Sequence, residues 1–318
     1  MAEAAYTHAG RPRREPRRRS WPHIFWIGLV LWALAVIVTF FTGNANLVPT
    51  IVLLGSFLVP VTFVAWAFDH RVDDGEIDAR TVLGAFLVGG VIGVLGASVL
   101  ETYLLHPSAW TYIGVGLIEE GVKLLVVVWF GRHIMAKTTH VGMILGGTVG
   151  FGFAAFESAG YALSAAMTVH GISLREMVET EILRGILAPV GHGLWTAILG
   201  GVLFAAAAGG HRYRFRWTIV FAYAGVAILH ALWDSMHGIA AALTLFLTGR
   251  TWQFTLLQHG YVPDASGAQA LVSTVIDWAG LIVISLIAIA WLLAVARHRP
   301  RGAAPEPRPP YGYDAGPR

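Results

Sequence analysis

The chain has 318 residues, of which 56% are hydrophobic and only 13% charged, and its mean hydropathy is positive, a composition that predicts a polytopic membrane protein rather than a soluble domain. The formal net charge is +3, and the sequence shows no clustering of basic residues on a folded face of the kind that binds nucleic acid. Because cysteine is absent, disulfides, Cys-ligated zinc and a thiol nucleophile are excluded, and any catalyst must use carboxylate, imidazole or hydroxyl groups.

Eight apolar runs are long enough to cross the roughly 30 Å of hydrocarbon in a bilayer as helices. The predicted fold class is therefore all-α, a polytopic membrane helix bundle that occupies residues 23–297. The flanking segments, 1–22 and 298–318, are rich in Arg and Pro and are predicted to be disordered tails near anionic lipid. The predicted helices cover 23–43, 47–68, 81–104, 110–130, 141–167, 183–208, 217–247 and 273–296.

The positions of Lys and Arg predict the orientation, because these residues are retained on the cytoplasmic side of a membrane. With eight helices and both termini cytoplasmic, 18 of the 22 basic residues lie on that side, and Arg175, Arg184 and Arg250 lie on the other. We therefore expect a multi-pass protein of the cell membrane whose direct partner is the lipid bilayer. The sequence leaves the oligomeric state open.

Two segments have features beyond hydropathy. In the fifth predicted helix, Gly142, Gly146 and Gly150 recur at every fourth position, a spacing that lets neighbouring helix backbones approach closely. We therefore expect this helix to lie inside the bundle. The segment from about 248 to 272 is long for a loop between packed helices, which suggests a partly re-entrant flap.

Charged and imidazole side chains occur in the middle of four predicted helices. A charged side chain at this depth costs about 2.5–3.5 kcal/mol on insertion scales, so such residues usually face a protein interior or a water-filled cavity. The fourth helix contains Glu119, Glu120 and Lys123, the fifth Glu157, the sixth His192, and the seventh His230, Asp234 and His237.

Helical spacing indicates which of these residues can cooperate, since residues three, four or seven apart share a face. Lys123 follows Glu119 by four positions and Glu120 by three, so we expect it to neutralise one carboxylate while the other points elsewhere. His230 and Asp234 are four apart and form one stripe with the histidine at position 237. Packed together, these helices would bring acids and imidazoles to one internal cavity.

Such a set of side chains suits a zinc ion. Zinc in hydrolytic sites commonly takes three N or O ligands and keeps a fourth position for water. We expect Glu157, His192 and His230 to be the ligands, a glutamate of the fourth-helix pair to be the general base, and Asp234 to orient an imidazole. No local zinc motif such as H-E-x-x-H is present, so the metal rests on the convergence of separate helices.

Four motifs within residues 110–240 resemble those of the PrsW intramembrane proteases, which are E-E-x-x-K, F-x-x-x-E, H and H-x-x-x-D. In this chain they read "EEGVK" at 119–123, "FAAFE" at 153–157, "HGLWTAILGG" from His192 and "HALWD" at 230–234, in the family order. The resemblance implies a membrane-embedded protease, related to the CAAX prenyl proteases, that cleaves membrane-anchored substrates such as anti-sigma factors. Those CAAX relatives carry His where this chain has Glu157, so their mechanism does not transfer unchanged.

Matched by position, the resemblance implies a role for each motif residue. One carboxylate of the Glu119 and Glu120 pair would activate water, with Lys123 beside them. Asp234 would support His230, and the histidine at position 237 matches no family motif. The residues implied to bind metal or to polarise the scissile carbonyl are Glu157, His192 and His230.

Less specific interpretations stay open. The glutamates and Lys123 could form a buried ion-pair cluster that only fixes helix packing, and His192, between two glycines and after Pro189, could cap a kinked helix. At the level of function, the alternatives are a proton- or ion-coupled transporter and a non-catalytic scaffold, such as the relative of this fold in gamma-secretase. Transport predicts ion-dependent flux, and a scaffold predicts an obligate partner without cleavage.

Overall fold

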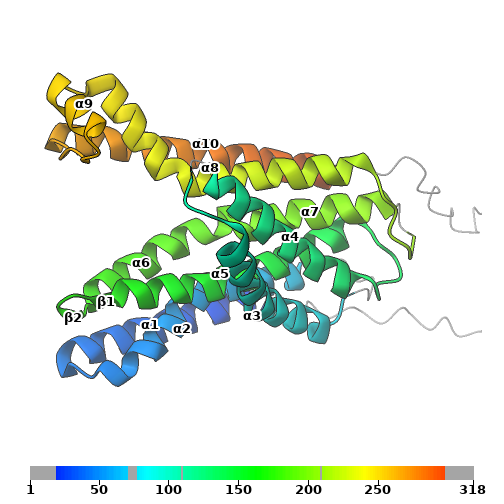
Figure 1. The fold of residues 1–318 in the computed structure, drawn as a ribbon. Coiled ribbons are helices and arrows are strands. Elements are labelled where there is room, and N and C mark those ends of the chain that lie inside the picture. Colours follow the sequence, from blue (N-terminus) through cyan, green and yellow to red (C-terminus); the bar gives the residue numbers. More distant parts are fainter. Residues whose placement is uncertain (1–18, 71–76, 109, 208–209, 298–318) are drawn as a thin grey trace, which may run out of the picture.

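The computed structural model describes residues 19–70, 77–108, 110–207 and 210–297, which form a bundle of long helices (Figure 1). The predicted disordered tails lie largely outside the described residues. The first helix begins at Trp21, so the last two residues of the predicted N-terminal tail are helical. This early start is favourable because Pro22 lies in the first turn, where its missing N–H costs no hydrogen bond.

Ten α-helices and one two-stranded hairpin make up the described part of the chain. In addition, 3-10 turns occupy Ala45–Leu47 and Ala188–Val190. The helices are α1 (Trp21–Thr42), α2 (Val48–Asp69), α3 (Ala79–Leu104), α4 (Thr111–Gly131), α5 (Thr139–Ala166), α6 (Leu174–Leu187), α7 (His192–Ala207), α8 (Trp217–Thr248), α9 (Thr251–Gln258) and α10 (Gly267–Arg297), and the hairpin pairs β1 (Met167–Thr168) with β2 (Gly171–Ile172).

The predicted polytopic helical bundle is confirmed. Among the described residues, seven helical segments are long and apolar enough to cross a membrane, with residues 174–207 counted as one. Helix α4 is not among these seven, since its 21 residues include three charged ones. It nevertheless packs against α3, α5, α7 and α8, so its charged side chains face other helices.

The sixth predicted helix, 183–208, is wrong as a single element. Helix α6 begins earlier, at Leu174, and the chain then turns through Ala188–Val190 before α7 begins at His192. Pro189 explains the interruption, because its ring removes a backbone donor and clashes with the preceding helical turn. The break places His192 at the first position of a helix in the middle of a continuous apolar segment.

Helix α5 lies inside the bundle, as its glycine spacing predicts. It packs against α7 so closely that a Cβ added at Gly146 would lie 2.1 Å from the carbonyl oxygen of Thr196. One added at Gly150 would lie 2.2 Å from the carbonyl oxygen of His192. The contact at Gly150 therefore fixes the backbone of α7 where His192 begins it.

Part of the segment predicted as a partly re-entrant flap folds as α9, and its last residues form the start of α10. The Gln253 side chain accepts a hydrogen bond from the Arg250 backbone N–H at 3.0 Å and pairs with Gln269, the two side-chain amides exchanging hydrogen bonds of 3.1 and 3.0 Å. Helices α8 and α10 run side by side, and α9 lies at one end of this pair (Figure 1). Re-entry into a membrane stays a prediction.

Candidate active site

Lys123 occupies the centre of a buried polar cluster. Its Nζ donates to Glu119 Oε2 at 3.0 Å and to Glu120 Oε1 at 2.8 Å, so the expectation that it neutralises only one carboxylate is wrong. One helical turn brings both acids within reach of a flexible four-carbon side chain. Lys123 and Glu120 are fully buried and Glu119 is 7% exposed. The ring of Phe153 covers the ammonium at 4.0 Å from its centroid, a cation–π contact from the "FAAFE" motif.

His192 connects this cluster to α5. Its Nδ1 lies 2.8 Å from Lys123 Nζ, and its Nε2 lies 2.9 Å from Glu157 Oε2. An ammonium can only donate, so Nδ1 must accept and the ring proton must lie on Nε2, where it donates to the carboxylate. The two contacts therefore specify one tautomer of the neutral imidazole.

His230, on α8, lies between three carboxylates. Its Nδ1 is 3.1 Å from Glu120 Oε1, while its Nε2 is 3.3 Å from Asp234 Oδ2 and 3.7 Å from Glu119 Oε2. The imidazole is 1% exposed and lies against the buried indole of Trp195, with ring centroids 4.8 Å apart. The predicted stripe of His230 and Asp234 therefore faces the same cluster as α4.

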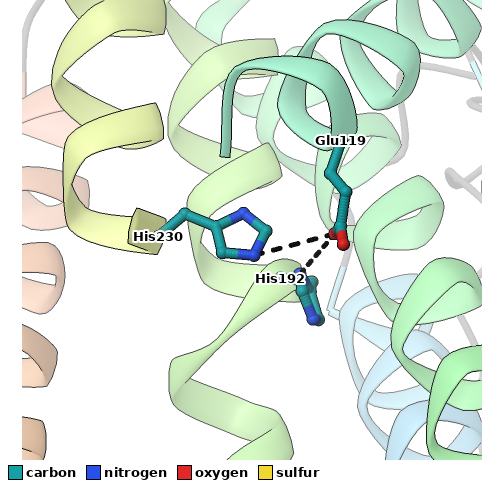
Figure 2. A group of neighbouring side chains, drawn as sticks. All are labelled: Glu119, His192 and His230. Atoms are coloured by element: carbon teal, nitrogen blue, oxygen red, sulfur yellow. Dashed lines mark ion pairs between the residues drawn. The ribbon is translucent and has the colours of Figure 1, made fainter. Parts of the chain in front are cut away.

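Three of these side chains are placed to share a metal ion. One ligand atom each from Glu119, His192 and His230 lies within 4.8 Å of the others, and both imidazoles face the Glu119 carboxylate (Figure 2). The Glu119 oxygen is 3.8 Å from His192 Nδ1 and 3.7 Å from His230 Nε2. Ligand atoms about 2.0–2.2 Å from a tetrahedral zinc are about 3.3 Å apart, so the three atoms must move closer together and the Lys123 ammonium must leave His192 Nδ1. The donor set fits zinc.

Glu157, predicted from the sequence as a zinc ligand, lies elsewhere in the cluster. Its Oε2 is 2.9 Å from His192 Nε2 and 2.5 Å from Nη2 of Arg184. It is not part of the group formed by Glu119 and the two imidazoles. This carboxylate therefore contacts Nε2 of His192, the ring nitrogen that does not face Glu119, and it can fix the orientation of the imidazole.

A polar cavity of about 400 Å³ lies beside the cluster, between α3, α4, α5 and α8. This volume is large enough for several water molecules, and the polar lining gives them partners. The side chains that line it include the carboxylates of Glu101, Glu119, Glu157 and Asp234 and the phenol groups of Tyr112 and Tyr161.

Two residues of this region were not found by sequence reasoning. Arg184 entered the sequence analysis only as a basic residue of the non-cytoplasmic side, yet it lies in α6 and forms an ion pair with Glu157. Glu101 lies in the last turn of α3, where a carboxylate is usually read as a solvated helix end. The sequence spacing of Glu101 did not indicate a role in the cavity, because its neighbours there come from other helices.

His237 does not join the site. Its side chain is 87% exposed, and its Nδ1 lies 3.7 Å from Asp277 Oδ2 on α10. Seven positions after His230 the ring still lies on roughly the same side of α8, but it is two turns away from α4 and beyond the packed cluster.

The fold and the site together define a polytopic membrane protein with a buried carboxylate–histidine centre beside a polar cavity. Comparison with known proteins gives the family. The family model described as "PrsW family intramembrane metalloprotease" matches residues 78–258, which is more than half of the chain and contains the whole cluster. The chain belongs to this family.

Two curated relatives, each named "Protease PrsW", support this assignment. The protein from Shouchella clausii (strain KSM-K16) is 28% identical over 120 residues, which are 37% of this chain and 51% of the relative. The protein from Geobacillus kaustophilus (strain HTA426) is 26% identical over 165 residues, 49% of this chain and 63% of the relative. The chain thus spans between half and two thirds of their lengths. No solved structure matches the chain.

Proposed function

We propose that the protein is an intramembrane endopeptidase that hydrolyses peptide bonds of membrane-anchored protein substrates. The observation that carries this proposal is the convergence of Glu119, His192 and His230 from three helices beside a polar cavity, in a chain of this family. Hydrolysis needs a water molecule, a proton acceptor and a group that stabilises the oxyanion at one place. The cavity has room for water, its carboxylates can accept a proton, and the three converging side chains could hold a metal ion.

In our proposal the zinc ligands are Glu119 Oε2, His192 Nδ1 and His230 Nε2, with Glu119 in place of the predicted Glu157. Each imidazole then has a carboxylate on its other nitrogen, Glu157 for His192 and Glu120 for His230. Such carboxylate partners fix the tautomer and raise the basicity of a ligating imidazole. Zinc, when bound, supplies Lewis acidity and lowers the pKa of a water molecule to about 7.

Asp234 is the proposed proton acceptor. Its carboxylate lines the cavity and lies 3.3 Å from His230 Nε2, so a water molecule beside this nitrogen would be within its reach. Glu120 is less suited to this role, because it is fully buried and bonded to Lys123, His230 and, at 3.4 Å, the Thr196 hydroxyl.

A metal-free version of the mechanism has support from Lys123. This ammonium already supplies a positive charge to Glu119, Glu120 and His192. In that version Glu119, which faces the cavity, takes the proton from water, and His230 donates to the developing oxyanion. Zinc content separates the two versions.

The substrate must present an unwound segment, since a helical peptide hides its carbonyl oxygens in its own hydrogen bonds. A substrate anchored in the membrane, as the resemblance to anti-sigma-factor proteases implies, would bring such a segment to the depth of the cavity. We also infer a cell-membrane location with both termini cytoplasmic, from the distribution of Lys and Arg. Reporter fusions at each terminus test this orientation.

The experiment that tests the proposed function uses purified protein in liposomes together with membrane proteins extracted from the expression host. New peptide termini are identified by mass spectrometry for the wild type and for the His230→Ala and Glu119→Gln variants. We expect cleavage in or next to transmembrane segments that is lost in both variants while they stay folded. Termini that appear equally with all three proteins, or with none, would contradict peptidase activity at this site.

A further inference from the structure

We propose that Arg184 is a positioning residue of the site: it holds the Glu157 carboxylate in place, so that His192 keeps its proton on Nε2 and presents Nδ1 to the metal position. The proposal deepens the proposed function and rests on it for the role of the metal. Arg184 belongs to none of the four sequence motifs, and it acts through Glu157 rather than on a substrate.

The contacts of Arg184 place it on one face of α5. Its Nη2 lies 2.5 Å from Glu157 Oε2 and its Nε donates to the Ser158 hydroxyl at 2.7 Å, while its guanidinium lies 4.3 Å from the centroid of the Tyr161 ring. Three partners from about one helical turn hold the planar group in one orientation. A guanidinium suits this task better than an ammonium, because its donors form a rigid fork and its face stacks on an aromatic ring.

A single carboxylate oxygen of Glu157 contacts both Arg184 and His192. Arg184 Nη2 and His192 Nε2 both contact Oε2, from residues eight apart on a segment that the turn at Ala188–Val190 bends. The bend therefore brings a guanidinium and an imidazole to the same carboxylate. Since Arg184 and His192 both donate to this oxygen, the guanidinium fixes the carboxylate in the orientation in which it accepts from His192 Nε2.

Loss of Arg184 should therefore act on His192. Without the guanidinium, Glu157 has one fixed partner fewer and can rotate away from His192 Nε2. His192 then loses a fixed acceptor on Nε2, and Lys123 remains as the contact that opposes a proton on Nδ1. We therefore expect the tautomer to shift toward a mixture, in which the Nδ1–H form blocks binding of a metal through that nitrogen. A purely structural role for Arg184 would lower stability but would leave the tautomer of His192 unchanged in the folded protein.

The test compares Arg184→Gln and Arg184→Lys with the wild type, and uses Arg175→Gln as the matched control. Arg175 lies on the same helix, is exposed, and pairs only with Glu179 among the described residues. The first measurement is the ¹⁵N NMR signal of His192 in metal-free protein, assigned with His192→Ala, which reports the tautomer. The second measurement is the Kd for Zn²⁺ by equilibrium dialysis. It is made for these variants, for Glu157→Gln and for the double variant Glu157→Gln, Arg184→Gln.

We expect the Nε2–H tautomer in the wild type and in Arg175→Gln, a mixture in Arg184→Gln, and an intermediate result in Arg184→Lys. The Kd for Zn²⁺ should rise about 10–100-fold in Arg184→Gln, as is typical for partners of metal-binding imidazoles. The double variant should bind zinc no more weakly than Glu157→Gln alone, because both changes act on one path.

An unchanged tautomer together with a Kd within about twofold of the wild type in folded Arg184→Gln would overturn the proposal. If this variant does not fold, Arg184→Lys decides by the same two measurements. A wild type that binds no zinc would end the metal site but not the proposal for Arg184, which the NMR signal of the metal-free protein still tests.

Discussion

Lys123 Nζ and His192 Nδ1 lie 2.8 Å apart, so the ammonium of one helix and the imidazole of another share a hydrogen bond at the centre of the bundle. The same Nζ donates to the carboxylates of Glu119 and Glu120. The ammonium thus lies between two carboxylates and an imidazole, where a metal ion would otherwise lie. A metal bound through Nδ1 would have to displace Lys123 from that nitrogen, leaving it to the two glutamates. The side chain thus compensates the charge of the site whether or not a metal is present.

Replacing Lys123 by Met should destabilise the protein strongly. The change keeps the length of the side chain but leaves two buried carboxylates without their cation, and breaking a buried ion pair costs about 3–5 kcal/mol. The thermal unfolding midpoint in detergent measures the loss. The double variant Lys123→Met, Glu120→Gln should recover part of it, since one unpaired charge is then removed. A midpoint equal to that of the wild type would show that Lys123 does not hold these acids.

Gly150→Ala should separate α5 from α7. A methyl group there would meet the carbonyl oxygen of His192 at 2.2 Å, and backbone cannot move aside as a side chain can. We expect the free energy of unfolding to fall by about 1–3 kcal/mol. Zinc binding should also become weaker, because His192 shifts with its backbone. Gly160→Ala on the same helix is the control: it meets no atom within 4 Å among the described residues and should leave both properties unchanged. Equal effects of the two substitutions would argue against this contact.

Glu101→Gln should stabilise the protein. Among the described residues the Oε1 atom of Glu101 is buried without a hydrogen-bond partner, and its carboxylate lies in one cavity with three others. Removing this charge relieves their repulsion, and we expect a gain of about 1 kcal/mol, which is about 2–4 °C in the midpoint. Glu176→Gln, an exposed acid on α6, should change the midpoint by less than about 0.5 kcal/mol. A lower midpoint for Glu101→Gln would mean that Glu101 has a stabilising partner.

His237→Ala should leave zinc binding and cleavage at the wild-type level, because the ring is exposed and contacts α10 rather than the cluster. His230→Ala, seven positions earlier on the same helix, should abolish both. Assayed side by side, the two variants show whether zinc binding and cleavage depend on both histidines of α8 or only on the buried imidazole of His230. Loss of zinc binding in His237→Ala would extend the site toward α10.

Much of the fold and of the cluster could be predicted from the sequence, for two physical reasons. Lipid requires long apolar helices, so hydropathy gave most helices, and the glycine spacing gave the buried position of α5. Charged groups are costly at membrane depth, so the acids and imidazoles had to meet other polar groups. The interruption at Pro189 was less apparent, because the hydropathy of the chain continues through it.

The individual roles could not be predicted in the same way. Which glutamate lies near the two imidazoles depends on how α4 and α5 rotate about their axes, and this places Glu119 where Glu157 was expected. The count of basic residues used Arg184 only for the orientation, because a count ignores tertiary partners such as Glu157. Glu101 likewise meets the other acids only through the packing of α3.

The most direct test of the account is the zinc content of detergent-purified protein, measured by elemental analysis for the wild type and for the double variant His192→Ala, His230→Ala. We expect about one zinc ion per chain in the wild type and a loss of it in the double variant, with both proteins folded. Equal and negligible zinc in the two proteins would contradict a metal centre formed by Glu119 and these imidazoles.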